Sequence, residues 1–449
     1  MYVIMAFIAA LSGILFGYDT GVMSGAILFI QEEYSLTAGM NGIVMSAVLL
    51  GALLGAIVSG RLTDHFGRKK LLLIVACIFI FGSLATAIAT SIPFLAIGRV
   101  VVGIAIGIAS YTAPLYISEI SPQHQRGALV ALNQLAITIG ILVSYVVDYG
   151  FAYHGEWRWM LGLGAVPGIL LFLGMLYLPD SPRWLLTKGH EKLARSILQK
   201  IRGPKAHIAT EFQSIKKTIQ SEPLDWTFVF SHHVRPVLWI GFGLAFIQQV
   251  TGINTILYYA PTILQMAGFG SSTTSILATM GIGASLVIFT IIALPLIDFV
   301  GRRPLLIWGL IGMAISLGAL SFLFRFGNHI DPSLHWMALI CMLIYIACFS
   351  FSLGPIMWLM IAEIYPLKIR GVGASLATCM NWASNLLVTV TFLKLIEIFG
   401  ASGTFALYMA LSIVSILFVY WLVPETKGVS LEQIEANLFS GKQWRKLGK

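Results

Sequence analysis

Three short charged motifs occur twice in this chain, in the same order and about 240 residues apart. Each follows a long apolar stretch, and each combines an acid with one or more cations. They lie at 64–69, 119–127 and 179–183 in the first half, and at 298–303, 363–371 and 424–427 in the second. Charges are costly near a lipid bilayer, so their repetition at the ends of apolar stretches indicates two homologous membrane bundles. Two bundles that move against each other are typical of transporters.

The composition is that of a polytopic membrane protein. Only 10% of the residues are charged and 58% are hydrophobic, whereas soluble domains contain roughly 25% charged residues. Apolar stretches of about 20 residues between polar breaks predict twelve transmembrane helices. They lie near 5–30, 40–62, 70–90, 94–118, 127–149, 158–178, 235–265, 273–297, 304–325, 336–362, 371–397 and 402–423. We therefore predict an all-α membrane protein with two pseudo-symmetric six-helix bundles and short cytoplasmic helices.

A polar stretch between the two halves divides the chain into four parts. Residues 1–180 form the predicted N-terminal bundle, and residues 235–424 form the C-terminal bundle. Residues 181–234 contain short amphipathic helical patterns, which predict a linker at the membrane surface. Residues 425–449 are predicted to form a short cytoplasmic tail.

The positive charges predict the orientation of the chain. Of the 28 Lys and Arg residues, 24 lie on the side reached after an even number of predicted spans. Cytoplasmic loops collect Lys and Arg, so both termini and the linker are expected in the cytoplasm. This distribution explains the net charge of +9 without a nucleic-acid partner. No Asn-x-Ser/Thr site occurs, which favours a multi-pass protein of the bacterial inner membrane, a plasma membrane.

Asp19 is an acid near the middle of the first predicted span. An unpaired carboxylate at that depth would take up a proton, because burial penalises the charged form. Arg99 lies inside the outer end of the fourth span and is the candidate partner. We predict that Asp19 binds a proton and that Arg99 couples its charge to a conformational change. The alternative is a static ion pair that only fixes helix packing.

Eight charged residues of the repeated motifs are predicted to form gate salt bridges at the cytoplasmic face. An Asp near a helix end, a Gly turn and adjacent cations suit a latch between helices. The residues are Asp64, Arg68, Glu119 and Arg126 in the first half and Asp298, Arg302, Glu363 and Arg370 in the second. Positive-inside anchoring is the alternative, and it explains the cations but not the repeated acids.

Uncharged polar residues inside the spans mark a candidate substrate path. Amides hydrogen-bond hydroxyl groups, and tryptophan rings pack on the C–H face of a sugar. The candidate residues are Gln134, Gln248, Gln249, Asn254 and Asn381, with the aromatic residues Phe349, Trp358 and Trp382. Helical spacing places Gln248 and Gln249 on different faces, and Gly354-Pro355 predicts a break beside a cavity or a partner helix. The set suits an uncharged polyol or sugar; the alternative is hydrogen bonding between helices.

The motifs together resemble the sugar porter family of the major facilitator superfamily. The resemblance covers the whole chain and rests on seven motifs. They are Gly60-x-Leu62-x-Asp64-x-x-Gly67-Arg68-Lys69, Arg126-Gly127, Pro179-x-Ser181-Pro182-Arg183, Gln248-Gln249-x-x-Gly252-x-Asn254, Gly354-Pro355-x-x-Trp358, Asn381-Trp382 and Pro424-Glu425-Thr426-Lys427-Gly428. The family includes bacterial proton-coupled xylose, galactose, arabinose and glucose symporters and the mammalian glucose facilitators.

This resemblance implies a secondary active transporter rather than an enzyme. It implies proton-coupled uptake of a monosaccharide, a hexose or a pentose, by alternating access. The candidate amides and aromatic residues would then bind the sugar, with Asp19 and Arg99 coupling the proton. The expected partners are a monosaccharide, a proton and the lipid bilayer, for a monomer without cofactor or metal. The alternatives are a sugar uniporter of the same fold, a proton-coupled polyol or inositol symporter, and a non-transporting sugar sensor.

Three positions depart from the family pattern. Leu286 stands where many relatives have a sugar-binding Asn, and Ser350 stands where some facilitators have an acid. Asp180 replaces the usual Glu of its motif, which is a conservative change. The first two positions bear on the identity of the sugar, which therefore stays open.

Overall fold

The computed structural model describes residues 1–122, 125–203, 208–220, 231–232, 234–326, 334–366, 369–429, 431–440 and 445. Every regular element in these ranges is helical. Eleven of the described helical segments are long and apolar enough to cross a membrane. The last of them covers two of the predicted spans, because α18 (Arg370–Leu422) turns at Gly400, whose φ is 69°. The described helices therefore accommodate twelve crossings.

The first half is built from long helices that pack closely. They are α1 (Tyr2–Tyr34), α2 (Ala38–Phe66), α3 (Arg68–Ala87), α4 (Ile92–Ile120) and α5 (Arg126–Ala152), followed by the pair α6 (Trp157–Gly162) and α7 (Ala165–Tyr177). Glycine recurs every fourth residue on α1 from Gly13 to Gly25 and faces α5. A Cβ atom at Gly17 would lie 1.9 Å from the carbonyl oxygen of Ile137. Small residues thus allow the α1 and α5 backbones to approach closely, as in other membrane helix pairs.

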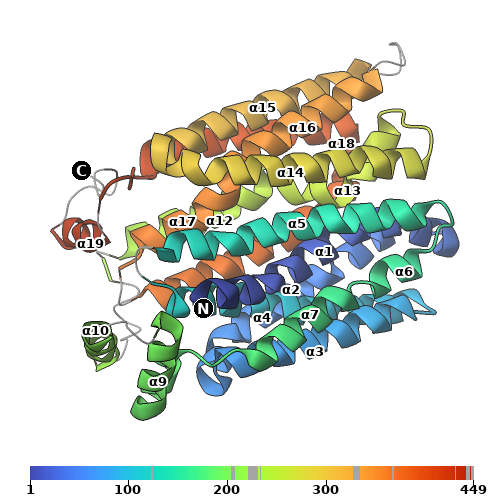
Figure 1. Cartoon of the computed structure of the whole chain (residues 1–449). Coiled ribbons are helices and arrows are strands. Elements are labelled where there is room, and N and C mark those ends of the chain that lie inside the picture. Colours follow the sequence, from blue (N-terminus) through green and yellow to red (C-terminus); the bar gives the residue numbers. More distant parts are fainter. Residues whose placement is uncertain are drawn as a thin grey trace.

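Three short helices follow the first half. They are α8 (Pro182–Thr187), α9 (Glu191–Arg202) and α10 (Ala209–Gln220). Figure 1 shows α9 and α10 beyond one end of the bundle, together with α19 (Leu431–Phe439). We refer to this end as the linker face and to the other end as the opposite face. Arg202 donates to the carbonyl oxygens of Ile120 and Ser121 at the end of α4, which fixes α9 on the first half.

The second half repeats the plan of the first with more interruptions. Its helices are α12 (Arg235–Val250), α13 (Ile253–Met266), α14 (Ser272–Val300), α15 (Arg302–Phe326), α16 (Leu334–Phe351), α17 (Leu353–Ile364) and α18. The span α12–α13 breaks at Gly252, whose φ of 96° favours a residue without a side chain. The span α16–α17 breaks at Ser352. The break expected at Gly354-Pro355 is therefore displaced toward Ser352, because a proline is tolerated in the first turn of the helix that follows.

The two halves contact each other along several helix pairs. α1 packs on α13, α5 on α14, and α2 on α18. Figure 1 shows α5 and α14 side by side along much of their length. On the side of the opposite face, the Tyr145 hydroxyl of α5 donates to the carbonyl oxygen of Leu257 on α13 at 2.9 Å. This bond crosses between the halves.

Candidate functional site

Four buried amide side chains of the second half form one hydrogen-bonded group, which we name the amide cluster: Gln248, Gln249, Asn254 and Asn381. The Gln249 side-chain amide donates to Asn381 Oδ1 at 3.1 Å and to Gln248 Oε1 at 3.3 Å. Asn381 donates to Gln248 Oε1 at 2.7 Å, and Asn254 donates to Gln249 Oε1 at 2.5 Å. The structure therefore brings together residues separated by more than 130 positions in the chain.

Gln248 and Gln249 point in different directions from α12 but share one partner: Gln248 also donates to the carbonyl oxygens of Leu353 and Gly354, and Gln249 accepts from Asn254. Both side chains are buried, and both contact Asn381. Neighbouring residues on a helix diverge by about 100°, since an α-helix has 3.6 residues per turn. A long glutamine side chain compensates for this divergence, so the two amides reach Asn381 from either side.

The helix breaks supply backbone partners for the cluster. The Gln248 side-chain amide donates to the carbonyl oxygens of Leu353 and Gly354, which follow the break between α16 and α17. Tyr345 donates its hydroxyl hydrogen to the carbonyl oxygen of Thr251, at the break between α12 and α13. An unpaired backbone carbonyl is expensive inside a bilayer, so each break needs such a partner.

The three aromatic candidates differ in their burial and in the half of the protein that they contact. Phe349 is buried in the last turn of α16, and Trp358 on α17 is partly exposed. Trp382 follows Asn381 directly and is buried, yet it contacts the first half. Its indole nitrogen donates to the Ser110 hydroxyl at 3.4 Å, and its ring lies 5.1 Å from that of Phe16, centroid to centroid. Trp382 therefore lies at the seam between the halves.

Gln134 is the one candidate amide of the first half. It lies on α5, and its side chain is partly exposed. The preceding residue, Asn133, faces α1 and accepts a hydrogen bond from Ser12 at 3.5 Å. The polar groups of the candidate site are thus concentrated in the second half, with the first half contributing at the seam.

Asp19 and Arg99 form a buried ion pair inside the first half. Arg99 Nη1 lies 2.6 Å from Asp19 Oδ1, and the two residues are 1% and 6% exposed. The other two guanidinium nitrogens of Arg99 have no hydrogen-bond partner among the described residues. The positive charge of Arg99 is therefore compensated mainly by one carboxylate, that of Asp19. Removing the charge from one member of such a pair is costly, because the other is left buried and uncompensated.

A tyrosine of the second half lies near the ion pair of the first half. Tyr258 lies on α13, one helical turn after Asn254, and is fully buried. It is close enough to interact electrostatically with both Asp19 and Arg99. Asp19 lies on α1 and Asn254 lies on α13, and these two helices pack against each other.

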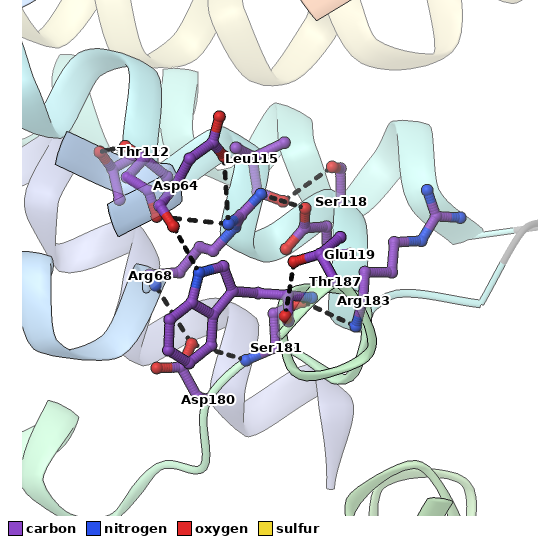
Figure 2. Close-up of polar contacts among 12 residues, drawn as sticks. Asp64, Arg68, Thr112, Leu115, Ser118, Glu119, Asp180, Ser181, Arg183 and Thr187 are labelled. Carbon is purple, nitrogen blue, oxygen red and sulfur yellow. Dashed lines mark hydrogen bonds and ion pairs between the residues drawn. The ribbon is translucent and has the colours of Figure 1, made fainter. Parts of the chain in front are cut away.

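The repeated motifs meet in space at the linker face, as Figure 2 shows for the first half. Arg68 pairs with Glu119 at 2.9 Å and with Asp64 at 3.5 Å. The Asp180 carboxyl accepts hydrogen bonds from the backbone N–H groups of Arg68, Lys69 and Ser181. Burial raises the pKa of Asp180, although these N–H donors oppose the rise. The first and third motifs thus form one structural unit at the start of α3.

The second half repeats this unit with different residues. Arg302 pairs with Glu363 at 2.9 Å and with Asp298 at 3.3 Å. Glu425 takes the place of Asp180 and accepts from the backbone N–H groups of Arg302 and Arg303. Gly67 and Gly301 hold positive φ angles of 85° and 108° at equivalent turns. A side chain at either glycine would collide with the facing carboxylate, which explains why the motif contains glycine.

These ion pairs lie within each half and not between the halves. Arg68 and Glu119 both belong to the first half, and Arg302 and Glu363 both belong to the second. Arg126 is partly buried and has an interaction partner. The side chain of Arg370 lies outside the described residues. The described pairs therefore brace each half separately, and a latch that ties the two halves together stays a prediction.

Several polar residues of the interior were missed by the sequence analysis. Tyr345 and Tyr258 were hidden because tyrosine is common in apolar spans. Asp148 is a completely buried carboxyl on α5. It lies one residue before the end of the predicted span 127–149. An acid within an apolar stretch was the available signal.

Comparison with known proteins gives matches over nearly the whole chain. A family model described as "Sugar (and other) transporter" matches residues 5–438. The galactose-proton symporter of Escherichia coli (strain K12) is 42% identical over 99% of this chain and 96% of its own length. The D-xylose transporter of Levilactobacillus brevis is 44% identical over 96% and 94%.

Solved structures agree with the sequence matches. The xylose transporter XylE from E. coli, in a partially occluded inward open conformation, has a TM-score of 0.84 at 31% identity. The alignment covers 96% of this chain and 99% of that one. The fold is therefore that of the major facilitator superfamily, as predicted. The chain belongs to the family of sugar (and other) transporters.

Proposed function

We propose that this transporter is a proton-coupled monosaccharide symporter that works by alternating access. The observation that carries the proposal is the buried Asp19–Arg99 pair, because Asp19 lies on α1 and α1 packs against α13, the helix that carries Asn254 of the amide cluster. A change in the charge of Asp19 alters its attraction to Arg99. This change acts at the contact between α1 and α13, the helix that also carries Asn254. Proton binding and sugar binding therefore bias the same contact between the halves.

The substrate class follows from the chemistry of the amide cluster. Its four side chains are uncharged and can donate and accept hydrogen bonds, as hydroxyl groups require. In the structure they satisfy one another. A sugar would exchange these mutual hydrogen bonds for bonds to its hydroxyls, while Trp358 and Trp382 offer rings to its C–H surface. Relatives named for galactose, arabinose and xylose support a hexose or a pentose.

We further infer that the linker face lies in the cytoplasm. The Lys and Arg residues of the repeated motifs and the linker helices gather at this face, and cytoplasmic surfaces of membrane proteins collect such charges. Both termini would then be cytoplasmic, in a monomer of the bacterial inner membrane. Opening of the linker face would release sugar and proton inside the cell.

A panel of monosaccharides and polyols tested in proteoliposomes checks this function. We expect one or a few monosaccharides to be concentrated when the outside is made acidic, and to equilibrate only when the pH gradient is absent. Uptake that does not depend on the pH gradient would indicate a uniporter instead. Accumulation of inositol alone would move the substrate class to polyols.

The ion pairs at the linker face make a separate prediction about conformation. We propose that the two motif units together hold the linker face closed. Replacing Glu119 with Gln weakens the unit of the first half by leaving Arg68 without its closest carboxylate, so we expect the linker face to open more often. Both side chains are buried, and removal of one charge from a buried pair costs about 3–5 kcal/mol, because the other charge is left uncompensated. The part of this cost that acts on the closed form alone shifts the population toward the open form. Spin labels on the linker-face ends of α4 and α17 should report the wider separation.

Glu191→Gln provides the control, because Glu191 pairs with Lys216 within the linker. We expect this variant to leave the distances between the halves unchanged. If Glu119→Gln lowers transport with no change in those distances, the ion pairs serve folding or topology and not gating.

A further inference from the structure

Asp148 is a carboxyl buried completely within the membrane-spanning part of the first half. Among the described residues no side chain donates a hydrogen bond to either of its oxygens, and the backbone N–H of Gly25 is the donor that approaches the carboxyl. The carboxyl packs against the backbone of Gly25 on α1, where a Cβ atom would lie 2.5 Å from Asp148 Oδ2. The interface between α1 and α5 thus contains a second buried acid, which takes no part in the Asp19–Arg99 ion pair.

The neighbours of Asp148 provide no compensating positive charge. Tyr18 on α1 and Tyr145 on α5 are the titratable residues that interact with it electrostatically. Asp19 on α1 lies next to Tyr18, and its charge is balanced by Arg99 of α4. None of the ion pairs among the described residues involves Asp148.

The other helices packed against this part of α5 do not supply a cation either. On α6, Arg158 is paired with Glu33 at 2.9 Å near the opposite face. The charged residue of α14 is Asp298, at the linker face and paired with Arg302. On α13, Tyr258 is the titratable residue that interacts with Tyr145.

An ionised carboxylate that has no cation beside it, and only one backbone N–H near it, is very unfavourable in such a place. The neutral form avoids this cost by carrying a proton. The arrangement seen here therefore favours the protonated form of Asp148 over the ionised form. Ionisable residues inside membrane spans are rare and mark ion pathways or proton relays in transporters.

The position of Asp148 connects this proton with the contact between the halves. Tyr145 lies one turn earlier on α5, where it donates to Leu257 of α13 and its ring packs on Gly283 of α14. Asp148 itself lies about 6 Å from the end of α5 at the opposite face, given a rise of 1.5 Å per residue. Separation of α5 from α13 and α14 would admit water close to the carboxyl. Water removes the cost of ionisation, so the proton can leave.

We propose that Asp148 is a second proton-binding site, which holds its proton while the opposite face is closed and releases it when that face opens. The proposal rests on the proposed alternating access but not on coupling by Asp19. By linkage, a site that binds protons more tightly in the closed form makes opening more favourable as the pH rises. Each proton released on opening changes the ratio of open to closed molecules by up to about tenfold per pH unit.

The test is a pH titration of opening in the absence of sugar. Spin labels on the opposite-face ends of α5 and α14 report the distance between the halves in wild type, Asp148→Asn, Asp19→Asn and the double variant. We expect the ratio of open to closed molecules to change less steeply with pH in Asp148→Asn than in wild type, by the equivalent of one released proton. The double variant should lose more of this slope than either single variant. Glu32→Gln, which replaces an exposed acid at the same face, should leave the dependence unchanged. An Asp148→Asn titration that matches wild type would overturn the proposal.

A second measurement covers the case in which Asp148→Asn folds poorly. Infrared spectra of Asp19→Asn protein at neutral pH should contain the carbonyl band of a buried protonated carboxyl. The proposal requires this band to persist while the opposite face is closed, and its absence would contradict the proposal even if the variant cannot be purified. Neither readout needs sugar, so failure of gradient-driven uptake would contradict the proposed function alone.

Discussion

Replacing Asp19 with Asn is expected to abolish accumulation of sugar against its gradient. Asparagine keeps the shape of the side chain but can neither ionise nor bind the coupling proton. Arg99 would lose the carboxylate that lies 2.6 Å away and would no longer respond to pH through this pair. The amide cluster is left intact, so sugar exchange across the membrane should continue. The expected result is a fall of the inside-to-outside sugar ratio to about one, with counterflow retained.

The measurement compares gradient-driven uptake with counterflow in the same proteoliposomes. Glu397→Gln is a matched control, because Glu397 is an exposed acid on α18, and it should accumulate sugar normally. Full accumulation by Asp19→Asn would show that the buried pair only fixes the packing of α1 on α4. Loss of counterflow as well would indicate that the substitution disrupts the structure.

Replacing Gln248 with Ala is expected to weaken sugar binding sharply. This side chain donates to the carbonyl oxygens of Leu353 and Gly354 and accepts from Gln249 and Asn381. Its removal takes one hydrogen-bonding group from the sugar and also releases its neighbours from their positions. Loss of one such hydrogen bond costs roughly 1–3 kcal/mol, or about a five- to hundredfold rise in Kd.

Gln265→Ala is the matched control for this prediction. Gln265 is also an amide in the second half, but it lies at the far end of α13 and donates to Ser272. Its replacement should change the Kd less than twofold, since it removes no amide of the cluster. Equal effects of the two substitutions on binding, measured by titration calorimetry, would place the sugar elsewhere.

The fold and the pairing of several charged residues could be predicted from the sequence. The duplicated motifs predicted two six-helix halves, and the depth of Asp19 and Arg99 predicted a pair that the structure forms at 2.6 Å. These inferences succeed because a charge within a membrane needs a partner, and few partners exist. The amides of the cluster were found for a related reason, because a buried polar side chain needs a hydrogen-bond partner.

The local breaks and their partners were harder to predict. The turn at Gly252 depends on a positive φ angle and on Tyr345, whose hydroxyl satisfies the Thr251 carbonyl from a distant helix. The contact of Asp180 with the turn at Gly67 forms because the start of α3 and the end of α7 lie together at the linker face. Such contacts are set by tertiary packing, and a single sequence does not contain their distances.

The most direct test of proton-coupled transport is the pH change that accompanies sugar entry. When sugar is added to lightly buffered proteoliposomes without a pH gradient, wild-type protein should carry protons inward, so that the external medium becomes more alkaline. Asp19→Asn protein should cause no such alkalinisation, although it should still exchange sugar in liposomes that are loaded with sugar beforehand. Sugar entry into wild-type liposomes with no alkalinisation would contradict symport and would make the protein a uniporter.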